Sequence, residues 1–357
     1  MFDYSIIGAG NGGQSVAAFL SLKGKKTILY DNDEKLIANL ERAGGIKLKG
    51  AKGEGFANNI RFTNHLSECV QSSKTILICT PAFAHYDIAI DLSDKLKDGQ
   101  YILLCPGSTG GALEFTHALN TKATVIVGEL ESFFYACRAG EGVAEIYGVK
   151  KELGIAAIPS TNTQKLMDQI AEDFPELKPR ENVLEVDLNN INPIVHVLPI
   201  ILNVSWVESK KHEFLFYKEG ISPTVAKLIE KMDLERLNIT EAIGVGAKSV
   251  IEWQELFYGV RENNLYETIM HNTAYNSIKA PNTLSSRLVI EDVPMGLVPM
   301  EALANLFNVH TPNITDVIDL SSKLMGVDFR RTGRTLERLG LAEIEQSELL
   351  DFVKGGI

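Results

Sequence analysis

The sequence has few cysteines and no excess of positive charge, and both absences exclude classes of protein. The four cysteines form no C-x-x-C pair and have no histidine at metal-ligand spacing, so we expect no disulfide framework and no metal site; they are Cys69, Cys79, Cys105 and Cys137. Lysine and arginine number 35 against 46 aspartates and glutamates, a net charge of -11. That balance argues against nucleic acid or an anionic membrane surface as the main partner.

Long hydrophobic runs and a leader segment are also lacking. The longest apolar stretch, residues 194–207, contains His196 and Pro199 and is too short to span a bilayer. The chain runs from Met1 into a strand-like segment without a basic, cleavable leader. We therefore expect a cytoplasmic protein with reduced cysteines and no membrane partner. Its 357 residues are enough for two domains, and we find no internal repeat.

The most informative feature that is present is a glycine-rich loop between a strand-like run and a helical stretch. Residues 4–7 lead into Gly8-Ala9-Gly10-Asn11-Gly12-Gly13, which has the spacing G-x-G-x-x-G. The first glycine permits a tight turn, the second lets a pyrophosphate approach the backbone, and the third lets the helix pack close to the strand. The helix N-terminus then offers N–H groups to the phosphates. A plain glycine-rich turn is the alternative.

An acidic residue follows the second predicted strand. Asp31 comes after the run at residues 25–30, where a carboxylate can accept hydrogen bonds from an adenosine ribose diol. A 2′-phosphate would be repelled there, and neither Asn32 nor Asp33 supplies an arginine for it. The cofactor predicted is therefore NAD, with NADP less favoured. Asp31 as a simple turn residue is the competing interpretation.

The first half of the chain alternates strands and helices, as in a doubly wound parallel sheet. Short apolar runs at residues 75–79 and 101–104 resemble strands buried on both faces. Thr80 and Pro81 follow the first of these runs, at the edge of the sheet where ligands bind, so we expect them beside the cofactor. The runs at residues 144–149 and 152–157 suggest a hairpin turned at residues 150–151.

From about residue 188 strand-like runs stop and helical periodicity takes over. Residues 223–237 space their apolar side chains along one helix face, and Pro299 stands in the first turn of another helix. We predict an α/β protein in which a dinucleotide-binding domain of the Rossmann type (1–187) precedes an all-helical substrate and catalytic domain (188–357). The reaction cleft is expected between them.

Three residues of the second half are candidates for chemistry. His196 lies in an otherwise apolar helical stretch, where a histidine is more often a satisfied core residue than a catalyst. Arg287 and Asp292 stand five residues apart, and a structural ion pair or a helix cap would explain them equally well.

Six segments, in order along nearly the whole chain, resemble the octopine/nopaline (opine) dehydrogenases. They are the Gly8 loop, Thr80-Pro81-Ala82, Pro106-Gly107 with residues 110–115, Tyr135-Ala136-Cys137-Arg138, Asn192-Pro193 with His196, and Arg287 with Glu291-Asp292-Val293-Pro294. Tyr217-Lys218-Glu219-Gly220, with Asp233, Glu235 and Arg236, also looks like that family. The chain departs from the pattern at Ser108, where relatives carry an arginine, and at residues 131–134. Substrate identity, and to a lesser degree cofactor preference, depends on these two loops.

The resemblance implies a reductive condensation, in which an amino acid joins a 2-oxo acid and NADH reduces the imine. His196 would then be the acid/base, since histidine titrates near neutral pH. Asp292 would fix its tautomer and favour its charged form, and Arg287 would grip the 2-oxo acid carboxylate. The family also implies a homodimer. The identity of the amino acid and of the 2-oxo acid stays open.

Two other functions compete with this one. The first is reduction of a simple 2-oxo acid or another imine, as in a ketopantoate-reductase-like enzyme. The second is a protein that senses NAD without catalysis, against which the presence of His196, Arg287 and Asp292 counts.

Overall fold

The computed structural model describes residues 1–140, 142–209 and 213–355, which form two compact units. The first unit comprises residues 1–107, 111–186 and 351–357. The second comprises residues 108–110 and 187–350. The first is called the nucleotide unit, after the glycine-rich loop that it contains, and the second is called the helical unit.

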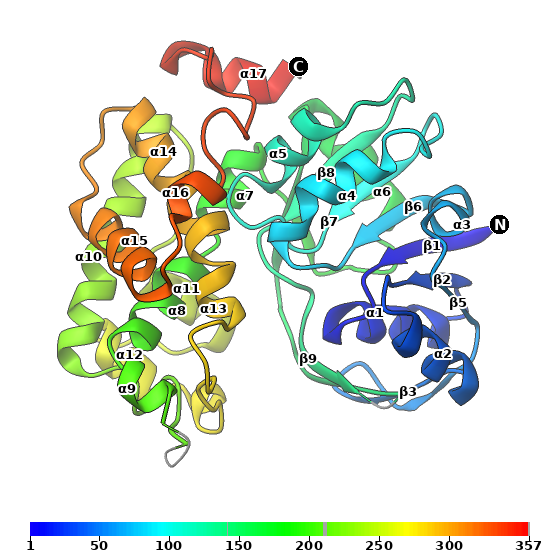
Figure 1. The fold of residues 1–357 in the computed structure, drawn as a ribbon, viewed down its shortest axis with the longest axis horizontal. Coiled ribbons are helices and arrows are strands. Elements are labelled where there is room, and N and C mark those ends of the chain that lie inside the picture. Colours follow the sequence, from blue (N-terminus) through cyan, green and yellow to red (C-terminus); the bar gives the residue numbers. More distant parts are fainter. Residues whose placement is uncertain (141, 210–212, 356–357) are drawn as a thin grey trace. The chain divides into compact units, whose positions relative to one another are not determined.

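The nucleotide unit is built on an eight-stranded sheet in which β1 is an inner strand (Figure 1). The order β12-β11-β8-β7-β6-β1-β2-β5 places strands on both sides of β1, as in a doubly wound fold. Neighbouring strands are parallel except for β11 and β8. The strands of this sheet are β1 (Phe2–Ile7), β2 (Thr27–Tyr30), β5 (Ile60–Thr63), β6 (Ser73–Ile78), β7 (Tyr101–Leu104), β8 (Ile126–Leu130), β11 (Leu153–Ile158) and β12 (Leu177–Pro179).

A second, four-stranded sheet has the order β4-β3-β10-β9. Its strands are β3 (Ile46–Gly50), β4 (Gly55–Ala57), β9 (Tyr135–Gly140) and β10 (Val143–Val149). Helix α1 (Asn11–Leu22) packs against strands of both sheets, which explains why its residues 13–21 are all buried. The other helices of this unit are α2 (Glu34–Ala43), α3 (Leu66–Gln71), η1 (Ala82–Ala84), α4 (His85–Leu92), α5 (Gly111–Ala118), η2 (Ser160–Asn162) and α6 (Thr163–Ile170).

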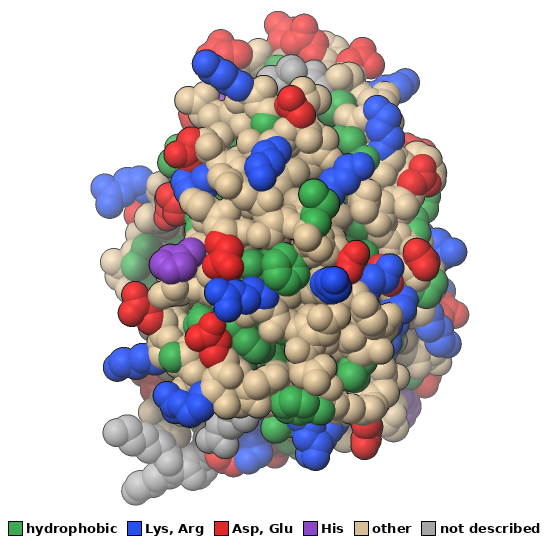
Figure 2. Space-filling view, turned by 90° about the vertical axis from the view of Figure 1, so that its right-hand side faces the viewer, with side chains coloured by type: hydrophobic (Ala, Val, Ile, Leu, Met, Phe, Trp, Pro, Cys, Tyr) green, Lys and Arg blue, Asp and Glu red, His purple; other side chains and the backbone are tan. Residues whose placement is uncertain are grey.

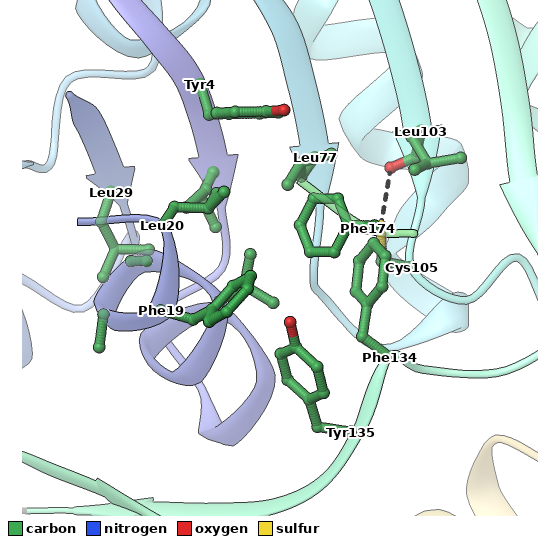
Figure 3. Close-up of a cluster of buried hydrophobic side chains, with 14 of the residues drawn as sticks. Tyr4, Phe19, Leu20, Leu29, Leu77, Leu103, Cys105, Phe134, Tyr135 and Phe174 are labelled. Carbon is green, nitrogen blue, oxygen red and sulfur yellow. Dashed lines mark hydrogen bonds between the residues drawn. The ribbon is translucent and has the colours of Figure 1, made fainter. Parts of the chain in front are cut away.

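An aromatic cluster lies beside α1 in the core of the nucleotide unit (Figure 3). Phe134 stacks on Phe174 with ring centroids 4.2 Å apart, and Phe19 meets Tyr135 edge to face. These rings come from α1, from the start of β9 and from the segment before β12. The cluster therefore fixes the position of the glycine loop that opens α1.

The hairpin predicted at residues 144–157 is wrong. β10 pairs with β9 and β3 in the small sheet, whereas β11 pairs with β8 and β12 in the large one. The run at 152–157 does extend the large sheet with an antiparallel pair, but the hairpin partner of β10 is β9. β10 alternates between buried and exposed residues, whereas β11 is buried throughout. Such a pattern shows how deeply a strand is buried but does not name the strand that pairs with it.

In the helical unit the described residues contain no strand, only one isolated bridge between Leu215 and Lys279. The α/β prediction, a Rossmann-type sheet followed by a helical part, is thus confirmed. The helices are α7 (Val183–Leu188, which starts in the nucleotide unit), α8 (Asn192–Ile201), α9 (Val204–Val207), α10 (Pro223–Ile243), α11 (Val250–Tyr258), α12 (Leu265–His271), η3 (Thr273–Tyr275), α13 (Arg287–Ile290), η4 (Val293–Leu297), α14 (Val298–Leu306), α15 (Pro312–Met325), α16 (Phe329–Thr332) and η5 (Gln346–Glu348). The last helix, α17 (Leu349–Gly355), begins in the helical unit and continues in the nucleotide unit from residue 351.

The helix ends follow from local sequence signals. The Ser222 side chain accepts a hydrogen bond from the Val225 N–H at the start of α10, and Pro223 occupies its first turn. Gly244 ends the same helix in a left-handed conformation. Ser249 and Glu252 form a capping box on α11.

Charged side chains of both signs are interspersed on the face shown in Figure 2, and its hydrophobic side chains lie in small separate groups. On that face, acidic and basic residues do not separate into large patches of one sign. In the described part of the chain, we also find no helix with the length and apolar composition needed to cross a membrane.

Candidate active site

The glycine loop has the tight geometry that its spacing predicts. Gly8 has a φ of +101°, and a Cβ atom there would lie 2.8 Å from Cγ2 of Thr80. A Cβ atom on Gly13 would lie 1.7 Å from the carbonyl oxygen of Gly8. Neither position has room for a side chain, so the first and third glycines serve the turn and the helix packing.

The second glycine is different, because a Cβ atom on Gly10 would meet nothing within 4 Å. Gly10 is the N-cap of α1, and the first turn of that helix has no capping side chain and no acidic residue. The helix N-terminus beside Gly10 is therefore open and free of negative charge, as binding of a pyrophosphate requires.

Asp31 closes the loop from the end of β2. One carboxylate oxygen accepts a hydrogen bond from the Ala9 N–H at 2.7 Å, and the other accepts one from the Asp33 N–H at 3.0 Å. Each oxygen keeps a second lone pair for a further donor. Asp31 thus has a structural role in the loop, which is compatible with binding a ribose hydroxyl.

Asn11 and Gly12 contact the rest of the nucleotide unit. The Asn11 side-chain oxygen accepts a hydrogen bond from the Ala139 N–H at 2.8 Å. A Cβ atom on Gly12 would lie 2.5 Å from the ring of Phe133, so Gly12 is needed where this ring packs on the helix. Sequence reasoning singled out residues 131–134 as unusual but did not predict that contact.

Thr80 and Pro81 lie between β6 and η1, next to Gly8. The Thr80 hydroxyl oxygen is buried and has no hydrogen-bond partner among the described residues. A buried hydroxyl without a partner is costly, so it suggests a ligand atom at this point. The Thr80 hydroxyl and the open helix N-terminus at Gly10 together fit a dinucleotide bound at this edge of the sheet.

In the helical unit, His196 and Asp292 form a pair. The Nδ1 atom of His196, on α8, lies 2.8 Å from a carboxylate oxygen of Asp292, just before η4. Both side chains are mostly buried, with 16% and 11% of their surfaces exposed. In the tautomer whose Nδ1 hydrogen is donated to the carboxylate, Nε2 carries the lone pair that can accept a proton.

Close packing between the two segments sets this distance. A Cβ atom on Gly296 would lie 2.2 Å from Cγ of Pro193, one turn before His196 on α8. Gly296 lies in the π-helical turn η4, whose Leu297 N–H bonds to the Asp292 carbonyl at 3.0 Å. The absence of a side chain at Gly296 lets η4 approach α8.

Arg287 forms an ion pair with Glu291. Its Nε lies 2.6 Å from the Glu291 carboxylate, one helical turn away. The arginine side chain is 67% exposed, whereas that of Glu291 is 7% exposed. An exposed guanidinium group held through its Nε atom is compatible with binding a substrate carboxylate. The structural ion pair, which was the alternative interpretation of the sequence, is also present.

Ser108 has a left-handed backbone, with a φ of +62°, which is unusual for a residue other than glycine. Its hydroxyl donates to the Met295 carbonyl at 2.9 Å, and the Thr109 N–H donates to the same oxygen at 3.1 Å. Buried Arg334 donates to the Thr109 carbonyl. Ser108 therefore fastens this segment to η4.

Sequence reasoning missed one neighbour of His196. The Tyr217 hydroxyl lies 3.2 Å from Nε2. The motif around Tyr217 was noticed but received no role, because 21 residues separate it from His196 and no spacing rule joins them.

Comparison with known proteins supports both parts of the chain. Residues 179–325 match the family described as "NAD/NADP octopine/nopaline dehydrogenase, alpha-helical domain". Residues 4–123 match "NAD-dependent glycerol-3-phosphate dehydrogenase N-terminus". An opine dehydrogenase of Arthrobacter sp. (strain 1C) is 38% identical over 354 residues, which cover 98% of each chain. This chain belongs to the opine dehydrogenase family.

Solved structures agree with the fold of this family member. An octopine dehydrogenase solved with NADH and agmatine has a TM-score of 0.82 at 19% identity and covers 99% of this chain and 98% of its own. A ketopantoate reductase from Ralstonia eutropha JMP134 has a TM-score of 0.63 at 15% identity and covers 90% of this chain and 99% of its own. The family assignment and the fold confirm the prediction of an NAD-dependent oxidoreductase of the opine dehydrogenase type.

Proposed function

We propose that this oxidoreductase joins the amine of an amino acid to the carbonyl of a 2-oxo acid and reduces the resulting imine, and that it catalyses the reverse oxidation. The 2.8 Å contact between His196 and Asp292 carries the proposal, because it gives the helical unit an oriented acid/base. Family members provide support: octopine dehydrogenase has been solved with NADH and L-arginine and with NADH and pyruvate.

The residues proposed to hold NADH share the sheet edge around α1. They are Gly8, Gly10, Asn11, Gly12, Gly13, Asp31, Thr80 and Pro81. When bound, NADH supplies the hydride that reduces the imine carbon. Two observations support this assignment. The helix N-terminus at Gly10 is open, and the buried hydroxyl of Thr80 has no hydrogen-bond partner in the described part of the chain.

The proton steps fall to His196. Condensation needs a neutral amine, so the neutral imidazole takes a proton from the substrate ammonium group at Nε2. The same proton then goes to the hydroxyl that leaves as water when the imine forms. Asp292 stabilises the imidazolium between these two steps through its bond to Nδ1.

Arg287 is proposed to bind the carboxylate of the 2-oxo acid. A guanidinium group holds a carboxylate through two parallel hydrogen bonds and so fixes its orientation. The bond from its Nε to Glu291 limits the swing of the side chain, which lowers the cost of ordering it on binding.

Three further expectations belong to the same proposal. Residues 1–187 act as the dinucleotide-binding domain and residues 188–357 as the substrate and catalytic domain. NAD is preferred over NADP. The enzyme works in the cytoplasm as a homodimer.

The test is a screen of NADH oxidation with a panel of amino acids against pyruvate and other 2-oxo acids, with the product identified by mass spectrometry. A secondary-amine dicarboxylate is expected only when both substrates are present. NADH oxidation with a 2-oxo acid alone would favour the ketopantoate-reductase-like alternative, to which the fold similarity points. NADH binding without turnover of any pair would favour an NAD-sensing protein.

A further inference from the structure

His196 has a hydrogen-bonding neighbour at each ring nitrogen. Asp292 takes Nδ1, and the hydroxyl of Tyr217 lies 3.2 Å from Nε2. Nε2 is the nitrogen through which the imidazole exchanges protons. The hydroxyl of Tyr217 therefore lies beside the reactive atom.

The tyrosine ring is held firmly in that place. Tyr217 stacks on Tyr275 with ring centroids 3.8 Å apart and planes 11° from parallel. The hydroxyl of Tyr275 in turn accepts a hydrogen bond from buried Gln254 at 2.6 Å. Burial raises the pKa of Tyr217 well above its usual value, so the side chain stays a neutral phenol.

The residues after Tyr217 fasten its backbone. Lys218 donates to the carbonyl groups of Ile269 and Met270 at the end of α12, at 2.9 Å and 2.6 Å. The Glu219 carboxylate accepts a hydrogen bond from the Leu215 N–H at 2.5 Å. A Cβ atom on Gly220 would lie 2.3 Å from the Phe216 carbonyl oxygen, so the turn requires glycine. All four residues of this motif thus serve to place the phenol.

A phenol suits a nitrogen that changes its protonation state. It donates its hydrogen to the lone pair of the neutral ring, and after rotation about the C–O bond its oxygen accepts the N–H of the imidazolium. Both states of a mostly buried histidine then keep a partner at Nε2 until a substrate group replaces the phenol there. A phenylalanine would leave that nitrogen without a partner in both states.

We propose that Tyr217 is a positioning residue for the proton transfer, which acts by holding Nε2 of His196 in both protonation states. This inference rests on the proposed role of His196 in catalysis. It adds a third member to the pair that sequence analysis found, and it gives the Tyr217-Lys218-Glu219-Gly220 motif a function.

Several charged groups on the elements around α8 pair with one another. α8 packs against α10, α13, α15, η4 and α9. Arg236 pairs with Asp233 on α10, Arg287 pairs with Glu291 beside α13, and Asp319 of α15 pairs with Arg330. Tyr258 and Tyr275 lie behind Tyr217 as neutral phenols, since burial raises both pKa values. Asp292 and Tyr217 are the groups that hydrogen-bond to the ring nitrogens of His196.

The test compares Tyr217→Phe with Tyr275→Phe. Each variant removes one buried phenolic hydroxyl from the same stack, but only Tyr217 contacts His196. Hydrogen bonds to charged groups are about twice as strong as neutral ones. Loss of the Tyr217 hydroxyl should therefore destabilise the imidazolium form of His196 more than the neutral form. We expect the titration midpoint of His196 in Tyr217→Phe, followed by NMR of protein with ¹⁵N-labelled histidine, to fall by about half to one pH unit.

Activity provides the second readout. In Tyr217→Phe we expect kcat to fall about 10- to 100-fold, the acid limb of the pH profile to move to lower pH, and NADH affinity to stay unchanged. Tyr275→Phe should leave the titration midpoint and the acid limb in place. The resonance of His196 is assigned by its loss in His196→Ala.

The outcomes separate this inference from the proposed function. An unchanged midpoint in Tyr217→Phe, or an equal shift in Tyr275→Phe, overturns the role of Tyr217 whatever the activity. Failure of the wild type to make a secondary amine overturns the proposed reaction, and the NMR titration still decides the role of Tyr217.

Discussion

Gly296 lies against the ring of Pro193, so close that a Cβ atom on the glycine would be 2.2 Å from Cγ of the proline. Pro193 precedes His196 by three residues, and Gly296 follows Asp292 by four. The contact therefore joins the two segments that place the imidazole and its carboxylate 2.8 Å apart.

The first prediction concerns this contact. Gly296→Ala should push η4 away from α8 and lengthen the bond between His196 and Asp292. We expect turnover to fall about 10- to 100-fold, since small displacements of catalytic groups have effects of that size. NADH affinity, measured by fluorescence titration, should not change. Gly140→Ala is the control, because the added methyl group meets nothing within 4 Å. Full activity in Gly296→Ala would show that the segments adjust without loss.

The second prediction treats His196 and Asp292 as one unit. His196→Ala should lower turnover by about 10² to 10⁴, the usual contribution of positioned proton transfer. Asp292→Asn should lose somewhat less, and the double variant should be little worse than His196→Ala alone. Because Asp292 stabilises the imidazolium, its loss should move the acid limb of the pH profile to lower pH. Losses that multiply, or loss of NADH binding, would contradict this assignment.

The third prediction concerns Arg287. Arg287→Lys keeps the positive charge but loses the planar fork, so the KM for the 2-oxo acid should rise about tenfold or more. NADH affinity should change little. Arg261→Lys is the control, since Arg261 is an exposed arginine paired with Glu255 at 2.7 Å. A parallel loss of affinity for NADH and 2-oxo acid would instead indicate a structural ion pair with Glu291.

The fourth prediction concerns cofactor preference. The wild type should bind NADH more tightly than NADPH, and Asp31→Asn should narrow the gap by about 5- to 100-fold, the equivalent of one charge-assisted hydrogen bond. Dissociation constants for both cofactors measure the effect. Glu34→Gln, on the exposed first turn of α2, removes the same charge without touching the glycine loop. A wild-type preference for NADPH would reject the assignment.

The fifth prediction concerns stability and pH. Burial lowers the pKa of Lys150 to about 8, and its ammonium group donates to the Phe133 carbonyl at 2.8 Å. In the unfolded chain the lysine has its ordinary pKa of 10.5 and keeps that proton up to about this pH. Burying the charged ammonium group therefore lowers the free energy of unfolding. This loss is fully present below pH 8 and disappears as the pH rises to about 10.5.

Lys150→Met should stabilise the protein at pH 7 by about 1 to 3 kcal/mol, and the gain should vanish above about pH 10.5. Denaturant unfolding at several pH values measures it, with exposed Lys151→Met as the control. A gain that does not depend on pH would mean that hydrophobic packing, not the buried charge, is responsible.

The sequence predicted features that depend on neighbouring residues and missed those that depend on tertiary contacts. The loop from Gly8 to Gly13 and the Pro223 helix start have local causes, so spacing and residue type revealed them. Asp31 was assigned to the ribose, but its bonds to the Ala9 and Asp33 N–H groups required coordinates.

The catalytic candidates show the same limit. The apolar helix around His196 is typical of a core histidine, and only the family resemblance favoured a catalytic role. The helix alone could not reveal that role, because Asp292, its hydrogen-bond partner, lies 96 positions away. The ring of Phe133 on Gly12 and the phenol of Tyr217 at Nε2 also join segments that are distant in sequence. Strand pairing followed the same rule, because β10 and β11 are close in sequence but lie in different sheets.

Ser108, Thr109 and Gly110 belong to the helical unit although the chain around them belongs to the nucleotide unit. Ser108 donates a hydrogen bond to Met295, and Thr109 accepts one from Arg334. A Cβ atom on Gly110 would lie 2.4 Å from Leu339. No single stretch of chain therefore encodes the complete helical unit. A fragment of residues 187–350 would lack these three residues, which pack and hydrogen-bond within the helical unit. Dissecting this enzyme into autonomous halves should thus yield a weakened helical fragment, which a peptide covering the missing segment should help to restore.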